Sequence, residues 1–240
     1  MTSPTAESGR ARLRSVGREV AFRRGDLLLS AGAPSTDVLL VESGLTKVVL
    51  HAHDDDATTV VGLVGPGELL GESGVITRAA RSATIVALTQ VRAVRVAATA
   101  FLRLRADDAG VRELLDETWR LRHERSDLRQ VLVTRPVRAR VELALLAWAR
   151  RFGTATDRGL VLRGLSQQDL AMAVAASEQH VAAALAGLRA DGLVETGRLS
   201  FRLPDPGRLG AASPGNQGES HRPAVQDLRN RGRQPRGPGT

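Results

Sequence analysis

The sequence predicts an α+β fold, and three observations support this class. Short apolar runs between glycines fill the region from about Val20 to Ala97, a texture typical of an antiparallel sandwich, barrel or jelly roll. From about Ala98, apolar residues recur at alternating steps of three and four, which predicts a long helix. Two short helices with N-cap signals and a pair of strands follow. We therefore expect a β domain, a long helix and a smaller helical domain in that order.

The composition restricts the chemistry. A chain of 240 residues can form one large or two small domains, and it contains no cysteine, which excludes disulfides, thiolate catalysis and cysteine-bound metals. The net charge is +8 and Lys47 is the only lysine, so arginine carries the positive charge. This balance favours an anionic partner, nucleic acid first. No apolar stretch approaches about 20 residues and no signal peptide is visible, so we expect a cytoplasmic protein without a membrane partner.

We expect residues 1–18 to be a flexible N-terminus, because they are polar, and residues 19–105 to form the β domain. Glycines separate the apolar runs of this domain. The expected strands are Val20–Phe22, Asp26–Leu29, Val38–Val41, Leu45–His51, Thr58–Val64, Ser82–Leu88 and Val91–Val96.

The glycine-rich loop from Pro66 to Thr84 is the main candidate site. Its glycines let the backbone approach a ligand closely, and consecutive N–H groups can cradle a phosphate. Arg81 can neutralise that phosphate through paired N–H bonds. Glu72 only accepts hydrogen bonds when ionised, so it suits a sugar hydroxyl. The alternative is a plain hairpin with a surface ion pair.

A second candidate lies at His51, His53 and Asp55, which resemble the His-x-His-x-Asp run of metal-dependent hydrolases. A catalytic metal needs several convergent ligands, and the later histidines fall in segments expected to be helical or disordered. We favour a solvated acidic hairpin tip and expect no metal and no catalytic residue.

Residues 106–135 are expected to form a long dimerisation helix. Apolar residues at alternating steps of three and four form a seam along one side of this helix. A seam of this kind usually pairs with its own copy, so we expect a homodimer. Arg125 interrupts the seam. Arg135-Pro136 ends the helix and starts a new one that runs to about Phe152. The seam residues are Val111, Leu114, Thr118, Leu121, Arg125, Leu128 and Leu132.

Residues 136–203 are expected to form a winged helix-turn-helix. Ser166 with Asp169 gives a capping-box signal, and Ser177 is a second N-cap. The second helix of such a unit can enter the major groove of DNA, whereas the alternative is an ordinary helical hairpin. We expect residues 204–240 to be a disordered basic tail.

Taken in order, these parts resemble the CRP/FNR (catabolite activator) family of bacterial transcription regulators from about Val20 to Leu203. Gly71-Glu72 followed by Arg81-Ser82-Ala83 is similar to the phosphate-binding cassette of that family. The resemblance implies a jelly roll for the β domain, a homodimer that binds double-stranded DNA, and no enzymatic activity. It implies cyclic AMP as the effector, with cyclic GMP as the second candidate, and RNA polymerase as a candidate partner. In the family, Glu72 would hold the ribose hydroxyl, Arg81 and Ser82 would hold the cyclic phosphate with the backbone of Gly71 and Ser73, and Val61 and Gly62 would form part of the wall.

Two departures from the family pattern are visible. Arg125-Ser126 stands where cyclic AMP-binding members carry two adjacent hydroxyl residues that reach the base, and Arg125 is not the expected group. The second helix has Glu178 and Ala183 in place of arginines, and the turn has Ala175 in place of glycine. There are therefore two alternatives. One is a regulator of the same family that acts without a ligand, and the other is a cyclic nucleotide-binding module whose DNA-binding domain has decayed. The candidate DNA contacts are Gln167, Gln168, Ser177, Glu178, Gln179, Arg189 and Arg198.

Overall fold

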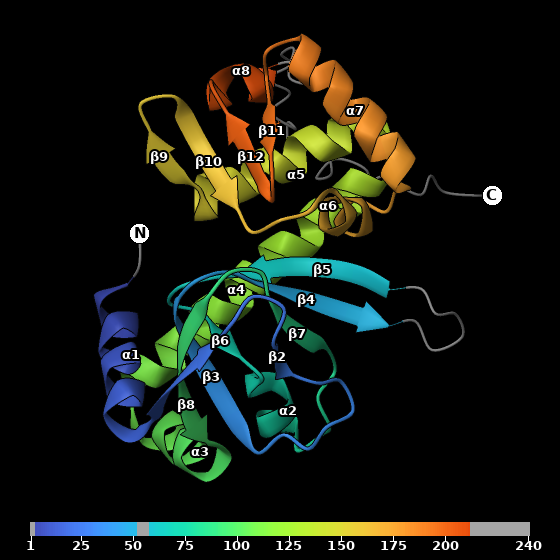
Figure 1. The fold of residues 1–240 in the computed structure, drawn as a ribbon. Helices are drawn as coiled ribbons and strands as arrows, with labels where there is room; N and C mark the ends of the chain where they lie inside the picture. Colours follow the sequence, from blue (N-terminus) through green and yellow to red (C-terminus); the bar gives the residue numbers. More distant parts are fainter. Residues whose placement is uncertain (1–2, 52–57, 212–240) are drawn as a thin grey trace, which may run out of the picture.

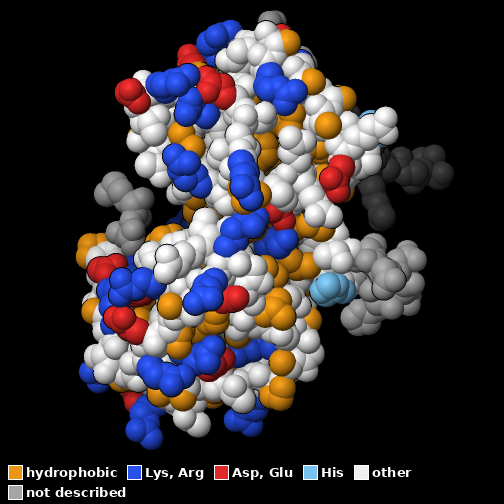
Figure 2. Space-filling model, in the orientation of Figure 1, with side chains coloured by type: hydrophobic (Ala, Val, Ile, Leu, Met, Phe, Trp, Pro, Cys, Tyr) orange, Lys and Arg blue, Asp and Glu red, His pale blue; other side chains and the backbone are white. Residues whose placement is uncertain are grey.

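The computed structural model describes residues 3–51 and 58–211 and shows two domains, one above the other, connected by helices α4 and α5 (Figure 1). On the face drawn in Figure 2, Lys and Arg side chains are spread over both domains and also lie where the domains meet. No helix in the described part of the chain is both long enough and apolar enough to cross a membrane.

The lower domain is an antiparallel jelly roll of two four-stranded sheets, with strand orders β1-β8-β3-β6 and β2-β7-β4-β5. Each expected strand is present, and the strand that sequence reasoning missed, β6, has two residues. Strand β3 is buried on both faces, since Val38 and Leu40 belong to one apolar cluster and Leu39 and Val41 to another. The strands are β1 Arg18–Phe22, β2 Leu27–Leu29, β3 Asp37–Ser43, β4 Thr46–His51, β5 Thr58–Val64, β6 Leu69–Leu70, β7 Thr84–Ala87 and β8 Val91–Ala97.

The expectation of a flexible N-terminus is wrong, because Pro4–Val16 forms helix α1, which packs along α4. Ala6 and Leu13 are fully buried there. A Cβ on Gly9 would lie 2.2 Å from the carbonyl oxygen of Gly110, so the two helices meet backbone to backbone. Small residues and one well-placed leucine therefore order a segment that looks polar in sequence.

The long helix is divided in two. Helix α3 (Ala98–Asp107) precedes α4 (Ala109–Val133), and Asp108 between them accepts a 3.0 Å hydrogen bond from the backbone N–H of Val111. Val111, Leu114 and Thr118 of the predicted seam are buried within their own chain, so only the later part of the seam is left to face another copy. The side chains of Leu128 and Leu132 lie outside the described part of the structure. Trp119 of the same helix is 37% exposed.

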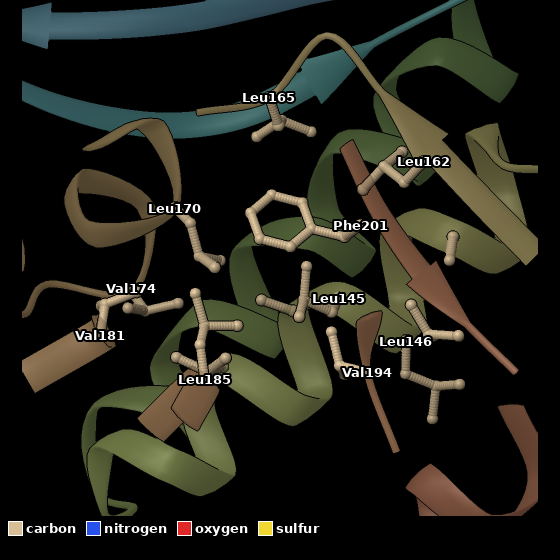
Figure 3. Packing of buried hydrophobic residues seen from close by; sticks show 14 of the residues in the cluster. Leu145, Leu146, Leu162, Leu165, Leu170, Val174, Val181, Leu185, Val194 and Phe201 are labelled. Carbon is tan, nitrogen blue, oxygen red and sulfur yellow. The ribbon is translucent and has the colours of Figure 1, made fainter. Parts of the chain in front are cut away.

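The upper domain is a winged helix-turn-helix packed around one apolar core, in which side chains from α5, α6, α7 and the wing point toward one another (Figure 3). The tail expectation fails for residues 206–211, which form helix α8 against α5 with Leu209 buried; residues 212–240 lie outside the described part. The elements are α5 Val137–Phe152, β9 Thr154–Thr156, β10 Gly159–Arg163, α6 Gln167–Ala173, α7 Glu178–Ala190, β11 Glu195–Gly197, β12 Ser200–Leu203 and α8 Pro206–Ala211.

The two domains share this core. Leu45, Val49, Val60 and Leu63 of the jelly roll belong to the same apolar cluster as the buried residues of α5 and α6. Strand β5 lies against α6, as Figure 1 also shows. The sheet β2-β7-β4-β5 of the jelly roll is therefore the surface on which the upper domain rests.

Candidate functional site

A cavity of about 360 Å³ opens between the glycine-rich loop, strand β5 and helix α4. Apolar side chains such as Leu29, Val48 and Ile85 line it together with buried polar groups. That combination is typical of a small-molecule site. The structure brings all the predicted ligand residues to this one cavity, namely Val61, Gly62, Gly71, Glu72, Ser73, Arg81, Ser82, Arg125 and Ser126.

Glu72 is the first residue of the short helix α2 (Glu72–Thr77) and is fully buried. Its Oε1 accepts a 2.7 Å hydrogen bond from Arg122 of α4. Its Oε2 is also buried, and no hydrogen bond from the described residues reaches it. An unsatisfied buried carboxylate oxygen is costly, so this atom is a ready acceptor for a ligand hydroxyl.

Arg81 lies across the loop from Glu72, and three hydrogen bonds to Gly71 and Asp37 hold its guanidinium. Its Nη1 donates to the carbonyl oxygen of Gly71 at 2.7 Å, and its Nη2 donates to the carbonyl and carboxylate oxygens of Asp37 at 2.7 and 2.6 Å. Burial lowers the pKa of the Arg81 guanidinium, against the opposing charges of Asp37 and Glu72. The side chain is thus fixed beside exposed Ser82. A guanidinium in this position can hold an anion with little reorganisation.

Gly71 makes this arrangement feasible. Its φ is +83°, which only glycine adopts readily. A Cβ at this position would lie 2.2 Å from Nη1 of Arg81. The glycine therefore provides both the turn into α2 and the room for the arginine.

At the other end of the cavity, Arg125 does not project freely. Its Nη2 is hydrogen-bonded to Oε2 of Glu68, which is 4% exposed, and the Oε1 of Glu68 also lies 3.2 Å from Nη2 of Arg151 in α5. Burial lowers the pKa of the Arg125 guanidinium, and the nearby Glu68 carboxylate opposes that effect. A carboxylate between two guanidiniums therefore joins the cavity to the upper domain.

Sequence reasoning missed Arg122, Arg129 and Glu68. Arg122 and Arg129 line the cavity, and burial lowers the pKa of Arg129. Arg122 lies 50 positions from its partner Glu72 and Glu68 lies 57 positions from Arg125, so no local pattern reveals either pair. For Arg122 and Arg129, the available signal was that both lie close to Arg125 on the same predicted helix.

The candidate DNA-contacting side chains are spread over the exposed face of the upper domain. Gln167 and Arg198 line one hollow together with Arg24 of the jelly roll, and Gln168, Ser177 and Glu178 line a second together with Thr58 and Thr59 of β5. Gln179 and Arg189 lie in neither, although both are exposed. The hydroxyl of Ser177 caps α7 by accepting from the backbone N–H of His180 at 3.3 Å, and Arg189 donates to Thr196 at 3.2 Å.

The turn between α6 and α7 is held from α5. Arg140 donates from Nη1 to the carbonyl oxygens of Val174 and Ala175, at 2.7 and 2.9 Å. Ala175 has φ +51°, a left-handed conformation that costs a residue with a side chain some free energy. The predicted capping box is present, since Ser166 and Asp169 exchange hydrogen bonds.

The described residues give no support to the alternative of a metal site at His51, His53 and Asp55. No group of three or more candidate metal ligands occurs among residues 3–51 and 58–211. His53 and Asp55 lie outside those residues, and His51 is exposed at the end of β4.

Comparison with known protein families places both domains. Residues 19–108 match the cyclic nucleotide-binding domain, and residues 139–212 match the Crp-like helix-turn-helix domain. A CRP-like cAMP-activated global transcriptional regulator from Mycobacterium tuberculosis is 30% identical over 193 residues, which cover 79% of this chain and 85% of that protein.

Solved structures agree with the fold. FixK2 from Bradyrhizobium japonicum matches with a TM-score of 0.70 at 20% identity, over 82% of this chain and 96% of that one. The c-di-GMP responsive global regulator CLP from Xanthomonas campestris matches with a TM-score of 0.68 at 20% identity, over 82% and 98% of the two chains.

Proposed function

Because the chain belongs to the CRP/FNR family of bacterial transcription regulators, we propose that a cyclic nucleotide controls its affinity for DNA. The family consists of transcription regulators rather than enzymes, and this chain carries both of its characteristic domains. The observation that carries the proposal is the buried Oε2 of Glu72, which receives no hydrogen bond from residues 3–51 and 58–211, in the same cavity as the fixed Arg81 guanidinium. One accepts a hydroxyl and the other binds an anion, which together match a cyclic ribose phosphate.

We propose cyclic AMP as the effector, with cyclic GMP as the second candidate. The relative from Mycobacterium tuberculosis is described as cAMP-activated, and the loop from Gly71 to Ser82 supplies the same types of group that the family uses. The base would enter beside Arg125 and Ser126, with Val61 and Gly62 as the wall. Ser82 and the backbone of Gly71 and Ser73 would complete the phosphate site.

We further propose that the protein acts as a homodimer on double-stranded DNA. The later part of the α4 seam, with exposed Trp119, supports pairing with a second copy. Ligand binding would bias the arrangement of the two α4 helices, and the break at Pro136 would then set the recognition helices about 34 Å apart. RNA polymerase is a candidate partner of the DNA-bound dimer.

The DNA surface supports binding with an altered sequence preference. Gln179 can read a base edge and Glu178 can accept from cytosine, whereas the arginines used elsewhere in the family are absent. Arg189 and Arg198 are exposed and can contact phosphates.

The test is genomic selection of DNA fragments bound by the full chain, with and without cyclic AMP. Enrichment of specific fragments with cyclic AMP alone supports the proposal. Enrichment of the same fragments in both samples favours a ligand-independent regulator, a reading motivated by Arg125. No enrichment at low salt, where the phosphate contribution is largest, favours a binding module without DNA recognition.

A further inference from the structure

Glu68 occupies an unusual place between the two domains. It follows Gly67 in the loop before β6, and its side chain is 5% exposed. Its carboxylate meets Arg125 from α4 on one oxygen and Arg151 from α5 on the other, where the backbone N–H of Gly65 also donates at 3.2 Å. One buried acid is thus shared by the helix that walls the nucleotide cavity and the first helix of the DNA-binding domain.

A second cavity of about 160 Å³ lies on the far side of Arg125, between the domains. Arg125, Arg129, Val61 and Gly62 line both cavities, so the same side chains separate the ligand space from the domain junction. Arg151 and Trp148 of α5 line the second cavity and not the first. Arg125 therefore lies at the boundary between the ligand space and the domain junction.

We propose that Glu68 is the residue through which an occupant of the nucleotide cavity acts on the DNA-binding domain; this inference rests on the proposed function. The bound base competes with Glu68 for the guanidinium of Arg125. When Arg125 turns to the ligand, Glu68 keeps Arg151 as its remaining guanidinium partner, and α5 is held differently against the loop. The ligand binds one arrangement better than the other, which is the condition for a population shift.

The competition follows from the chemistry of the groups. A guanidinium has five donors and no acceptor, and Glu68 accepts from Nη2 of Arg125, so a base acceptor that takes this same Nη2 must displace Glu68. The side chains of Arg125 and Glu68 are largely buried. Breaking their ion pair without a new partner for each would therefore cost free energy, because water can reach them only in part. The exchange therefore has two discrete arrangements.

Two variants test the inference with cyclic AMP as the ligand and a fragment recovered by the genomic selection as the DNA. Glu68→Gln removes the shared charge, and Arg151→Gln removes the upper-domain partner without touching the nucleotide cavity. Glu42→Gln is the matched control, because Glu42 pairs with Arg14 on the surface of the jelly roll at 2.9 Å. Cyclic AMP affinity is measured by calorimetry and DNA affinity by fluorescence anisotropy.

In wild type and Glu42→Gln we expect cyclic AMP to change DNA affinity at least about fivefold, with the same factor in the reciprocal experiment. In Glu68→Gln and Arg151→Gln, cyclic AMP should still bind while the factor falls to below about twofold.

Wild-type coupling in both variants would overturn the inference and leave the proposed function intact. Failure of the wild type to bind cyclic AMP or cyclic GMP would instead overturn the proposed function. If Glu68→Gln does not fold, Arg151→Gln alone decides the question.

Discussion

The side-chain nitrogen of Lys47, the only lysine in the chain, lies 2.5 Å from Oδ1 of Asp169. Lys47 belongs to β4 of the jelly roll and Asp169 to the capping box of α6, so this buried ion pair joins the two domains. The side chains of Lys47 and Asp169 are 18% and 6% exposed. Lys47, which carries the only side-chain primary amine, therefore lies where the jelly roll and the helix-turn-helix domain meet.

Lys47→Gln should lower the free energy of unfolding by about 3 kcal/mol, because it leaves a buried carboxylate without its counter-charge. The two hydrogen bonds from Ser166 to Asp169 keep the cost near the lower end of the usual range. Urea denaturation measures the difference. As control, Glu19→Gln breaks an exposed pair with Arg92 and should cost less than about 1 kcal/mol.

The same pair predicts a pH dependence. Burial alone would raise the pKa of Asp169, but hydrogen bonds from Lys47 and Ser166 bring it below its ordinary value. A lowered pKa gives stability that is complete above the unfolded value, about 3.9, and is lost as pH falls through the folded value. The stability difference between wild type and Lys47→Gln should be constant at neutral pH and shrink below about pH 4. A difference that stays constant down to pH 3 would contradict the pairing.

Gly71→Ala should lower cyclic AMP affinity by at least about tenfold, because its Cβ would collide with the guanidinium of Arg81 and displace the phosphate ligand. Gly32→Ala is a matched control: its φ is also positive, at +78°, but nothing lies within 4 Å of its Cβ. That variant should lose about 1 kcal/mol of stability and keep its nucleotide affinity. Equal affinity losses in the two variants would show that strain, rather than contact with Arg81, is responsible.

Ala175→Gly should raise the free energy of unfolding by about 1 kcal/mol, since glycine adopts the positive φ of this turn without steric cost. Ala182→Gly, at an exposed position in the middle of α7, should lower it by about the same amount. Thermal denaturation of the two variants gives opposite signs if the turn is strained. Destabilisation by both would contradict it.

The ligand cavity could be predicted from sequence because its central residues are close together in the chain and have characteristic types. Gly71, Glu72, Arg81 and Ser82 share one loop, and this loop needs only local geometry to bring them near each other. The longer strands of the jelly roll were also predictable, since their apolar runs are local, whereas β9 and β10 of the upper domain were not predicted. The two-residue strand β6 was too short to give a pattern.

The contacts that connect the domains could not be predicted. Lys47 and Asp169 are 122 positions apart, and Glu68 meets Arg151 of the upper domain from a loop of the jelly roll. Such pairs have no periodicity, and each member alone looks like an ordinary surface charge. Helix α1 was missed for a related reason, because its packing depends on the close approach of Gly9 and Gly110 rather than on an apolar stripe.

The central claim is that Glu72 and Arg81 hold a cyclic nucleotide, and direct calorimetric titration tests it most sharply. Wild type should bind cyclic AMP at well below millimolar concentration. Glu72→Gln should bind more weakly by about 2 kcal/mol, a loss of about thirtyfold, because a charged acceptor is lost. A 2′-deoxy analogue of cyclic AMP should lose affinity in the wild type and much less in the variant. Absence of binding of both cyclic AMP and cyclic GMP at millimolar concentration would contradict the account.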